Sequence, residues 1–404
     1  MSTGPLNGIR ITEFTSAWAG PYATCLLAFL GAEVIKVESR KRLDHSRVTS
    51  FTTSKVFSGP DESPVFDNLN LNKRSICLNL SQPKAVEIAK GLVANSDVAV
   101  ENMRPGVIAR LGLDYARLKD VKSDIIYLSS SACGQTGPHR ERVGYAPNFA
   151  GGAGLSYVTG YPDLPPSVLA GSMDLRSAAT AAFAILAALL YRQRTGEGQY
   201  IDLASQEAIA ILNADALIDY VMNQRLRTRQ ANRHETMAPH NCYRCRGDDN
   251  WISIAVADDQ EWRALCVAIR RPELVDDERF STAGARWRHQ EALDEIVGAW
   301  AKEQDACEAM HLLQAAGVAA TPSLSNKGLF QDPHLRQRNV FQQVSHPVLG
   351  TDWVIAPPWR LCETPAGVWS RSPLLGEHTE SVLHELLGMQ PDEIRQLQQE
   401  QVIY

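Results

Sequence analysis

Hydrophobic and polar positions follow two patterns along the first half of the chain. Short runs rich in β-branched residues alternate with longer segments in which apolar residues recur at helical spacing. The pattern predicts strands at 9–14, 33–38, 75–80, 97–102, 125–129 and 200–203, with helices at 22–29, 83–94 and 205–222. This alternation is typical of a mainly parallel sheet covered by helices, so we expect an α/β domain.

An Ala-rich run and a polar bridge mark the organisation beyond this pattern. The run at 178–191 has 14 residues and is too short to cross about 30 Å of hydrocarbon, so it predicts a buried helix. The bridge at 223–234 contains four Arg and almost no apolar residue, which indicates the exit from the first domain. A strand at 251–256, amphipathic helices and a return strand at 317–323 follow.

Composition removes several classes of partner. The chain has 404 residues and a net charge of −6, so it lacks the general basic surface that nucleic acid or an anionic membrane would attract. Its eight cysteines have no framework spacing, and the N-terminus shows no basic region followed by an apolar one. We therefore expect reduced thiols and a cytoplasmic location.

Three common cofactor and nucleophile motifs are missing. The first strand is followed by Thr15-Ser-Ala-Trp-Ala-Gly-Pro21 instead of G-x-G-x-x-G, which weakens the case for a nicotinamide or flavin cofactor. The sequence contains neither G-x-x-x-x-G-K-[ST] nor G-x-S-x-G, so ATPase and serine hydrolase activities are not supported.

Basic residues near predicted strand ends are candidates for an anion site. They are Lys36, Arg40, Lys73, Arg74, Arg104 and Arg110. Open α/β sheets bind ligands at strand ends, and a mixture of Arg forks and Lys point charges suits a phosphorylated ligand. Solubility alone also places Lys and Arg at exposed strand ends, so spacing leaves both explanations open.

Asp174 stands directly before the Ala-rich helix. The positive end of a helix stabilises an ionised carboxylate, and such a group can attack an activated acyl carbon. The alternative from local sequence is a helix cap or an ordinary first-turn acid.

Several motifs, in order from about residue 5 to residue 388, resemble the class III CoA-transferases, the family of formyl-CoA transferase and carnitine CoA-transferase. They include Ala19-Gly-Pro21, Leu30-Gly-Ala-Glu-Val-Ile-Lys-Val-Glu38, Leu71-Asn-Lys-Arg-Ser-Ile76, Val100-Glu-Asn-Met-Arg-Pro-Gly106 and Leu374-Leu-Gly-Glu-His-Thr379. The resemblance implies a large Rossmann-like domain built from both ends of the chain, with an N-terminal part at 1–222, a linker and small domain at 223–325, and a return at 326–404. It also implies an interlocked dimer, either a homodimer or a heteromer with a paralogous subunit.

The resemblance implies residue roles as well. Asp174 becomes the nucleophile, Arg110 matches a CoA-phosphate-binding Arg, and the family's usual Arg after K-V-E is Ser39 here, with Arg40 next to it. The residues expected to contact CoA are Ala17, Trp18, Ala19, Arg40, Lys73, Arg74, Asn102, Met103, Arg104, Arg110 and Tyr145. CoA enters as a substrate, and neither a prosthetic group nor a metal is expected. Backbone donors for an oxyanion are sought near residues 17–20 and 151–154.

Alternatives within the same fold remain open. Acyl-CoA racemases of this fold place a His after Gly where this chain has Gly144-Tyr145-Ala146, and Ala146 also replaces an acid frequent in transferases. The tetraglycine loop of formyl-CoA transferase is absent, and His240 in that region is a possible substrate-facing residue or a structural one. A CoA-binding, non-catalytic subunit is a further alternative. The G-Y-x-P run resembles transferases for aromatic and dicarboxylic acids, such as benzylsuccinate, with succinyl-CoA as donor.

Overall fold

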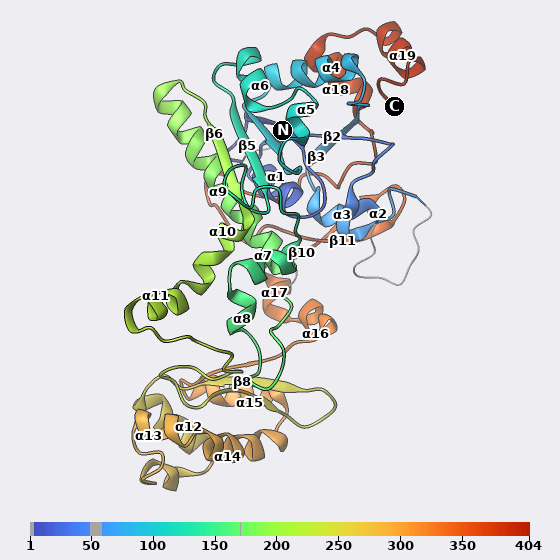
Figure 1. The fold of residues 1–404 in the computed structure, drawn as a ribbon. Helices are drawn as coiled ribbons and strands as arrows, with labels where there is room; N and C mark the ends of the chain where they lie inside the picture. Colours follow the sequence, from blue (N-terminus) through green and yellow to red (C-terminus); the bar gives the residue numbers. More distant parts are fainter. Residues whose placement is uncertain (1–3, 49–58, 170) are drawn as a thin grey trace. The chain divides into compact units, whose positions relative to one another are not determined.

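The computed structural model describes residues 4–48, 59–169 and 171–404 (Figure 1). The chain forms two compact units, a large one at 1–156, 168–226 and 334–404, and a small one at 157–167 and 227–333. The chain passes between units at 226 and 333 instead of the predicted 222 and 325, and residues 157–167 join the small unit because they pack against residues 227–333.

A six-stranded sheet forms the centre of the large unit. Its strands are β1 (Arg10–Phe14), β2 (Glu33–Glu38), β3 (Lys73–Cys77), β4 (Val98–Glu101), β5 (Ile126–Ser131) and β6 (Tyr200–Ala204). They lie in the order β3-β2-β1-β4-β5-β6, and every neighbouring pair is parallel. The predicted α/β class is thus confirmed. The strand order reverses between β1 and β4, and the carboxyl ends at such a switch point form the usual ligand crevice of an open α/β sheet.

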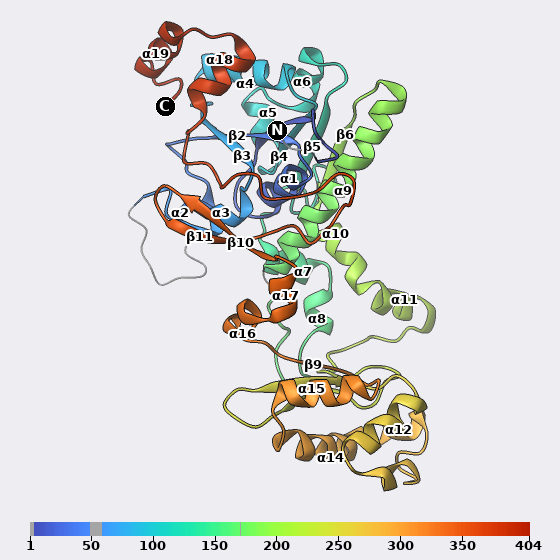
Figure 2. The same ribbon diagram turned by 180° about the vertical axis from the view of Figure 1, so that it is seen from behind.

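Helices cover both faces of this sheet (Figures 1 and 2). On one face, α1 (Ala19–Phe29) and α9 (Ser172–Thr195) pack against Ile11, Val98 and Val100. On the other face, α4 (Pro83–Ala94), α6 (Tyr115–Val121), α18 (Thr379–Leu387) and α19 (Pro391–Gln399) contribute to a second core with Ala99. Residues 98–100 of β4 thus point alternately into the two opposite cores, which explains why this stretch is continuously apolar.

The Ala-rich helix is longer than the sequence pattern predicted. It starts at Ser172, six residues before the predicted start, and its 24 residues are long and apolar enough to pass a length test for crossing a membrane. Within the described part of the chain it is the one helix that does so. Its buried residues, including Ala178, Ala181 and Ile185, pack in the core with α1, whereas Phe183 is 73% exposed. The prediction of a buried helix therefore holds for one face of α9 only.

Shorter elements complete the large unit. These are α2 (His45–Val48), α3 (Pro64–Leu69), α5 (Val107–Arg110), α7 (Ala146–Gly152), α10 (Ser205–Ala210), α11 (Ala214–Asn223), β10 (Phe341–His346) and β11 (Gly350–Ile355). The chain crosses from one unit to the other within α8 (Leu155–Val158) and at the start of α17 (Pro333–Gln337). A bridge between Leu78 and Ile403 attaches the C-terminus beside β3. Both ends of the chain therefore contribute to this unit.

The small unit has its own sheet and core. The antiparallel strands β7 (His240–Arg244), β8 (Trp251–Ala255) and β9 (Ala319–Pro322) lie in chain order, and β9 is the predicted return strand. The α-helices that lie between β8 and β9 along the chain are α12 (Asp259–Ala268), α13 (Ala283–Arg288), α14 (Gln290–Lys302) and α15 (Ala306–Ala315). After β9 the chain forms α16 (Asn326–Gln331). Trp262, Leu293 and Leu313 are buried in its core.

Candidate active site at the carboxyl ends of the strands

Two loops meet at the switch point of the large sheet. Asn102, directly after β4, accepts a hydrogen bond from Ser16 N at 2.9 Å and donates one to Ser16 O at 2.8 Å. A Cβ at Gly20 would lie 2.9 Å from the Asn102 side chain, so only glycine permits this approach. The structure thus brings Asn102 together with the loop that contains Ala17, both of which are predicted to contact CoA.

The loop after β1 has an unusual backbone. Ala17 has φ 70°, in the left-handed region, and its N–H donates to Asp44 Oδ1 at 3.0 Å. Trp18 follows as the N-cap residue of α1, and Ala19 begins that helix. Because the amides of Ser16 and Ala17 already have acceptors, the predicted oxyanion donors at 17–20 reduce to the residues that open α1.

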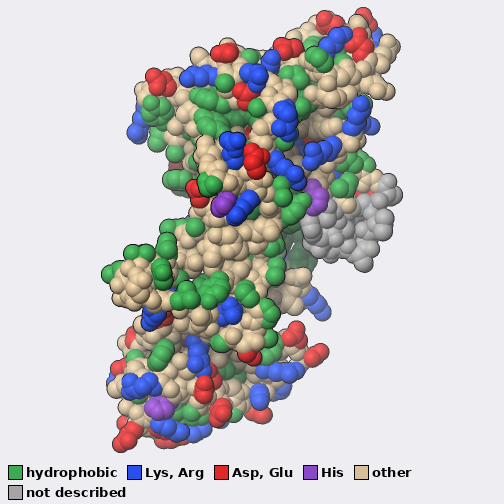
Figure 3. Space-filling view, in the orientation of Figure 1, with side chains coloured by type: hydrophobic (Ala, Val, Ile, Leu, Met, Phe, Trp, Pro, Cys, Tyr) green, Lys and Arg blue, Asp and Glu red, His purple; other side chains and the backbone are tan. Residues whose placement is uncertain are grey.

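Three of the predicted basic residues are exposed: Arg40 and Arg104 lie beyond the carboxyl ends of strands, and Arg110 ends the short helix α5. Arg40 follows β2 and lies near Cys77 at the end of β3. Burial raises the pKa of the Cys77 thiol to about 12, and the charge of Arg40 acts in the opposite direction. Arg104 follows β4, and the Arg110 guanidinium lies 3.4 Å from the position of a Cβ on Gly106, the N-cap residue of α5. Lys and Arg side chains gather over the middle of the large unit in Figure 3. The three Arg are placed where a phosphorylated ligand could reach them.

Met103 lies between Asn102 and Arg104 but turns inward. Its side chain packs against the core beneath α4, and its N–H donates to Glu101 Oε2 at 2.7 Å. Burial raises the pKa of Glu101 to about 7, although the hydrogen bonds from Ser129 and Met103 act in the opposite direction. For Met103, the backbone is therefore the part nearest to the loop surface.

Lys73 does not occupy an exposed strand end. Its fully buried ammonium donates to Glu13 Oε1 at 2.9 Å, to Pro21 O at 2.7 Å and to Asn70 Oδ1 at 2.9 Å. Burial lowers the pKa of Lys73 from its ordinary value, while Glu13 acts against this shift. The predicted CoA contact of Lys73 is therefore wrong, because β3 begins at this residue and the side chain points into the interior.

Arg74 lies at the opposite edge of the sheet from the candidate site. It is the second residue of β3, and it pairs with Glu33 at 3.0 Å, the first residue of β2, and with Glu385 at 2.7 Å. Strands in a parallel sheet all begin at the same edge, so Arg74 belongs to the amino ends. Its predicted CoA contact is also wrong. Lys36, the remaining basic candidate, is fully buried.

Asp174 is in the first turn of α9 and not directly before the helix. Its neighbour Met173 is buried with Phe149 and Ala150 of α7 and Ile209 of α10. Burial raises the pKa of Asp174 to about 6, so desolvation, and not the positive helix end that we expected, is the effect that the surroundings impose. Within residues 4–48, 59–169 and 171–404, no side chain forms an ion pair with its carboxylate.

Tyr145 stands at the N-terminus of α7, the helix that packs beside Met173. It is 71% exposed, and its ring stacks on His45 of α2 at a centroid distance of 6.5 Å. His45 N in turn donates to Ser16 Oγ at 3.3 Å. A chain of contacts therefore runs from the loop after β1 through His45 and Tyr145 to the helix beside Asp174.

The glycines at 151–154 serve packing. Ala153 N and Gly154 N donate to Phe149 O and Gly151 O, so these amides are already used within the end of α7. A Cβ at Gly152 would lie 2.6 Å from Gln206 Oε1. The predicted oxyanion donors in this segment are thus corrected: Gly152 is needed for the close approach of α7 to α10.

His240 belongs to the small unit. Its Nδ1 lies 2.6 Å from Asn232 O, and its ring is 5.2 Å from that of His234. These contacts within the unit favour the structural explanation. No group of three or more His, Cys, Asp or Glu that could hold a metal ion occurs among the residues that the structure describes.

Asp44 is the functional candidate that sequence reasoning missed. It lies in the loop after β2, where no sequence motif marks it, and it accepts a hydrogen bond from Ala17 N in the loop after β1.

Comparison with known proteins identifies the family of the chain. The family model described as CoA-transferase family III matches residues 6–379. The chain is 34% identical over 99% of its length, and 98% of the relative's, to succinyl-CoA–D-citramalate CoA-transferase of Chloroflexus aurantiacus. It is 32% identical over its full length, and 99% of the relative's, to the succinyl-CoA–L-malate CoA-transferase beta subunit of the same organism.

A solved structure gives the same result for the fold. The crystal structure of a CAIB/BAIF family protein from Brucella suis matches with a TM-score of 0.85 at 30% identity, over 95% of this chain and 99% of that one. The protein belongs to CoA-transferase family III and is a class III CoA-transferase.

Proposed function

We propose that Asp174 is the nucleophile of this transferase. The single observation on which this depends is a carboxylate on the first turn of α9 that is partly buried and has no ion pair among the described residues. With a pKa of about 6, this group is mostly ionised at neutral pH yet poorly solvated. An ionised carboxylate without a neutralising partner retains its electrons for attack on an acyl carbon.

The reaction proceeds in balanced steps. An Asp174 oxygen attacks the donor thioester carbonyl, the C–S bond breaks, and an acyl-aspartyl anhydride and CoA thiolate form. The thiolate attacks the Asp174 carbonyl, which releases the donor acid and leaves an aspartyl-CoA thioester. The acceptor carboxylate attacks that thioester to give a second anhydride and thiolate, and thiolate attack on the acceptor acyl carbon yields the new acyl-CoA and free Asp174. Acyl activation is conserved throughout, so ATP is not consumed.

The three exposed arginines of the large unit's candidate site bind the phosphates of CoA in this proposal. Arg40, Arg104 and Arg110 offer guanidinium forks for phosphate oxygens. The loop at 17–19, Asn102, Met103 and Tyr145 line the path from that edge toward α9. The N–H groups that open α1 are the remaining backbone donors for the developing oxyanion. Neither a prosthetic group nor a metal is required.

For the substrates, we propose succinyl-CoA as donor and a dicarboxylic acid as acceptor. The two relatives from Chloroflexus aurantiacus are both named for succinyl-CoA, paired with D-citramalate in one and L-malate in the other, and both of these acids are dicarboxylates. Benzylsuccinate, also a dicarboxylate, stays within this class as the aromatic candidate.

A direct assay tests the activity. The enzyme is incubated with succinyl-CoA and a panel of mono- and dicarboxylic acids in deuterated water. The CoA esters are then separated by chromatography and identified by mass spectrometry. We expect a new CoA ester with an aliphatic or aromatic dicarboxylate and retention of the α-hydrogen. Wash-in of deuterium at the α-carbon without a new ester would instead establish the racemase.

We also propose a dimer in the cytoplasm, either a homodimer or a heteromer with a paralogous subunit. One relative is named a beta subunit, and α11 exposes Leu217, Ile218, Val221 and Met222, which a partner subunit could cover. Light scattering of the purified chain, alone and with a paralogue, measures the oligomeric state. If the chain is inactive alone, gains activity with a paralogue and tolerates loss of Asp174, it is the non-catalytic subunit.

A further inference from the structure

The loop at 15–18 is tied down by two buried side chains of opposite charge. Thr15 O accepts a hydrogen bond from Lys36 Nζ at 2.9 Å, and Ala17 N donates to Asp44 Oδ1 at 3.0 Å. Lys36 lies on β2, and Asp44 lies in the loop that follows it. Two nearby peptide groups of the loop after β1 are therefore held by the neighbouring strand and its loop.

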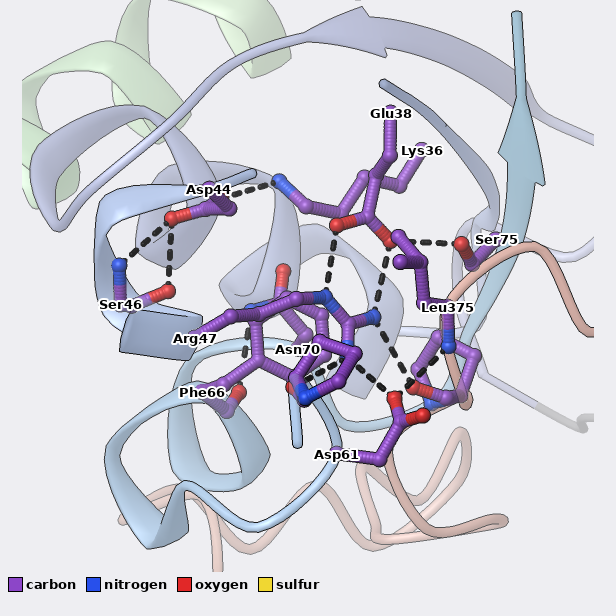
Figure 4. A network of polar contacts seen from close by, with 12 residues as sticks. Lys36, Glu38, Asp44, Ser46, Arg47, Asp61, Phe66, Asn70, Ser75 and Leu375 are labelled. Atoms are coloured by element: carbon purple, nitrogen blue, oxygen red, sulfur yellow. Dashed lines mark hydrogen bonds and ion pairs between the residues drawn. The ribbon is translucent and has the colours of Figure 1, made fainter. Parts of the chain in front are cut away.

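Lys36 and Asp44 also hold each other. Lys36 Nζ lies 2.9 Å from Asp44 Oδ2, and the two side chains are 0% and 2% exposed. Figure 4 shows Lys36 pointing to one side of the Asp44 carboxylate while Ser46 contacts the other side through its N–H at 2.8 Å and its hydroxyl at 2.7 Å. Neither charged group can touch a ligand at the surface.

The electrostatics favour a fixed pair. Burial alone would lower the pKa of Lys36, but Asp44 and Glu13 raise it above its ordinary value. Burial alone would raise the pKa of Asp44, but Lys36 and the Ser46 hydrogen bonds lower it. Both groups remain charged near neutral pH, so the pair keeps its attraction in a medium of low polarity.

The loop is held in a conformation that it would not adopt unaided. Ala17 has φ 70°, a region that non-glycine residues enter at a cost of about 1 kcal/mol or more. Such a conformation persists where the surrounding structure over-determines it, and here Lys36, Asp44 and Asn102 act on neighbouring peptide groups. Strain of this kind clusters at ligand sites.

We infer that Lys36 and Asp44 are positioning residues of the CoA site: they hold the loop at 15–18 in the shape that receives the CoA thioester. The inference deepens the proposed function and rests on it, because that proposal supplies the ligand of the loop. A loop fixed before binding loses less conformational entropy on binding, so the affinity for CoA depends on this buried pair.

Three variants test the inference. Lys36→Met/Asp44→Ala removes both charges at once and leaves Glu13 with Lys73 at 2.9 Å, which avoids an unpaired buried charge. Asp44→Asn keeps the shape but turns an N–H toward either Lys36 or Ala17, both donors. The matched control is Ser46→Ala. It removes the Ser46 hydroxyl that donates to Asp44 Oδ1, the oxygen that also accepts from Ala17 N, and it keeps the bonds from Lys36 and Asp44 to the loop at 15–18.

The measurements are the dissociation constant for CoA by titration calorimetry, the KM of the acid acceptor and the circular dichroism spectrum. For the double variant we expect CoA binding to weaken at least about tenfold, which corresponds to about 1.4 kcal/mol. Asp44→Asn weakens CoA in the same direction, while Ser46→Ala binds it like the wild type. The KM of the acceptor stays near the wild-type value, a selectivity that general loosening of the fold would not produce.

Wild-type affinity for CoA in a folded double variant would overturn the inference, and so would an equal loss in Ser46→Ala. If the double variant does not fold, Asp44→Asn decides, with unchanged CoA binding again contradicting the role. A wild-type enzyme that transfers CoA while the variants bind CoA normally refutes this inference alone. A wild-type enzyme that does not bind CoA refutes the proposed function, and the inference with it.

Discussion

Replacing Asp174 by asparagine should stabilise the large unit while it removes transferase activity. Burial raises the pKa of Asp174 from an ordinary 3.8 to about 6, so folding disfavours the ionised form. A shift of about two pKa units corresponds to roughly 3 kcal/mol, and we expect about 2 kcal/mol because the side chain is still partly exposed. Asparagine carries no charge and avoids this penalty.

The size of the effect depends on pH. The folded state holds the proton of Asp174 more tightly than the unfolded state, so the penalty is fully present above about pH 6 and disappears as the pH falls toward 3.8. Urea unfolding at pH 7.5 and at pH 4.5 should therefore show a higher midpoint for Asp174→Asn at pH 7.5 and a smaller difference at pH 4.5.

A matched control separates this effect from the loss of charge in general. Asp120→Asn makes the same substitution at an exposed position of α6 and should leave the midpoint unchanged at both pH values. Intact mass must exclude deamidation of the introduced asparagine back to aspartate. If Asp174→Asn is no more stable than wild type at pH 7.5, the carboxylate has a stabilising partner and the reasoning about its reactivity fails.

Three further predictions concern pH, CoA recognition and the buried lysine. Below about pH 6, kcat/KM for the donor should fall about tenfold per pH unit, because protonated Asp174 cannot attack; a flat profile down to pH 5 would contradict this. Arg110→Ala should weaken CoA binding about tenfold, a loss that the charge-matched change Arg117→Ala does not reproduce in calorimetry. Lys73→Met should destabilise the protein by about 3 kcal/mol in urea titrations, because it leaves Glu13 poorly paired. If the variant instead changes the preference for CoA over dephospho-CoA, Lys73 does contact the ligand and its assignment to the interior is wrong.

The fold followed closely from local patterns where strands are buried on both sides. The predicted strand at 33–38 and helix at 83–94 match β2 and α4, since their boundaries coincide with clear changes in hydrophobic periodicity. The start of α9 was missed because Ser172 and Asp174 are polar residues in a first turn, which hydrophobic periodicity does not detect.

The candidate site was predictable where motifs mark backbone geometry. Asn102 and the loop with Ala17 were both predicted to contact CoA, and hydrogen bonds join them in the structure. Lys73 was misplaced because a lysine that opens a strand and a lysine that ends one look alike in sequence, and only tertiary contacts show that its ammonium is buried. Asp44 had no local signal at all, since its role depends on a residue 27 positions away.

The central claim is that Asp174 becomes covalently attached to the group being transferred, and trapping tests it most directly. The enzyme is incubated with succinyl-CoA, quenched with hydroxylamine, digested and analysed by mass spectrometry, with Asp174→Asn treated in parallel. The account predicts a hydroxamate on the peptide that contains Asp174, present only in wild type and only after exposure to the thioester. Turnover of the same sample with no label on Asp174, or with the label on another residue, would contradict it.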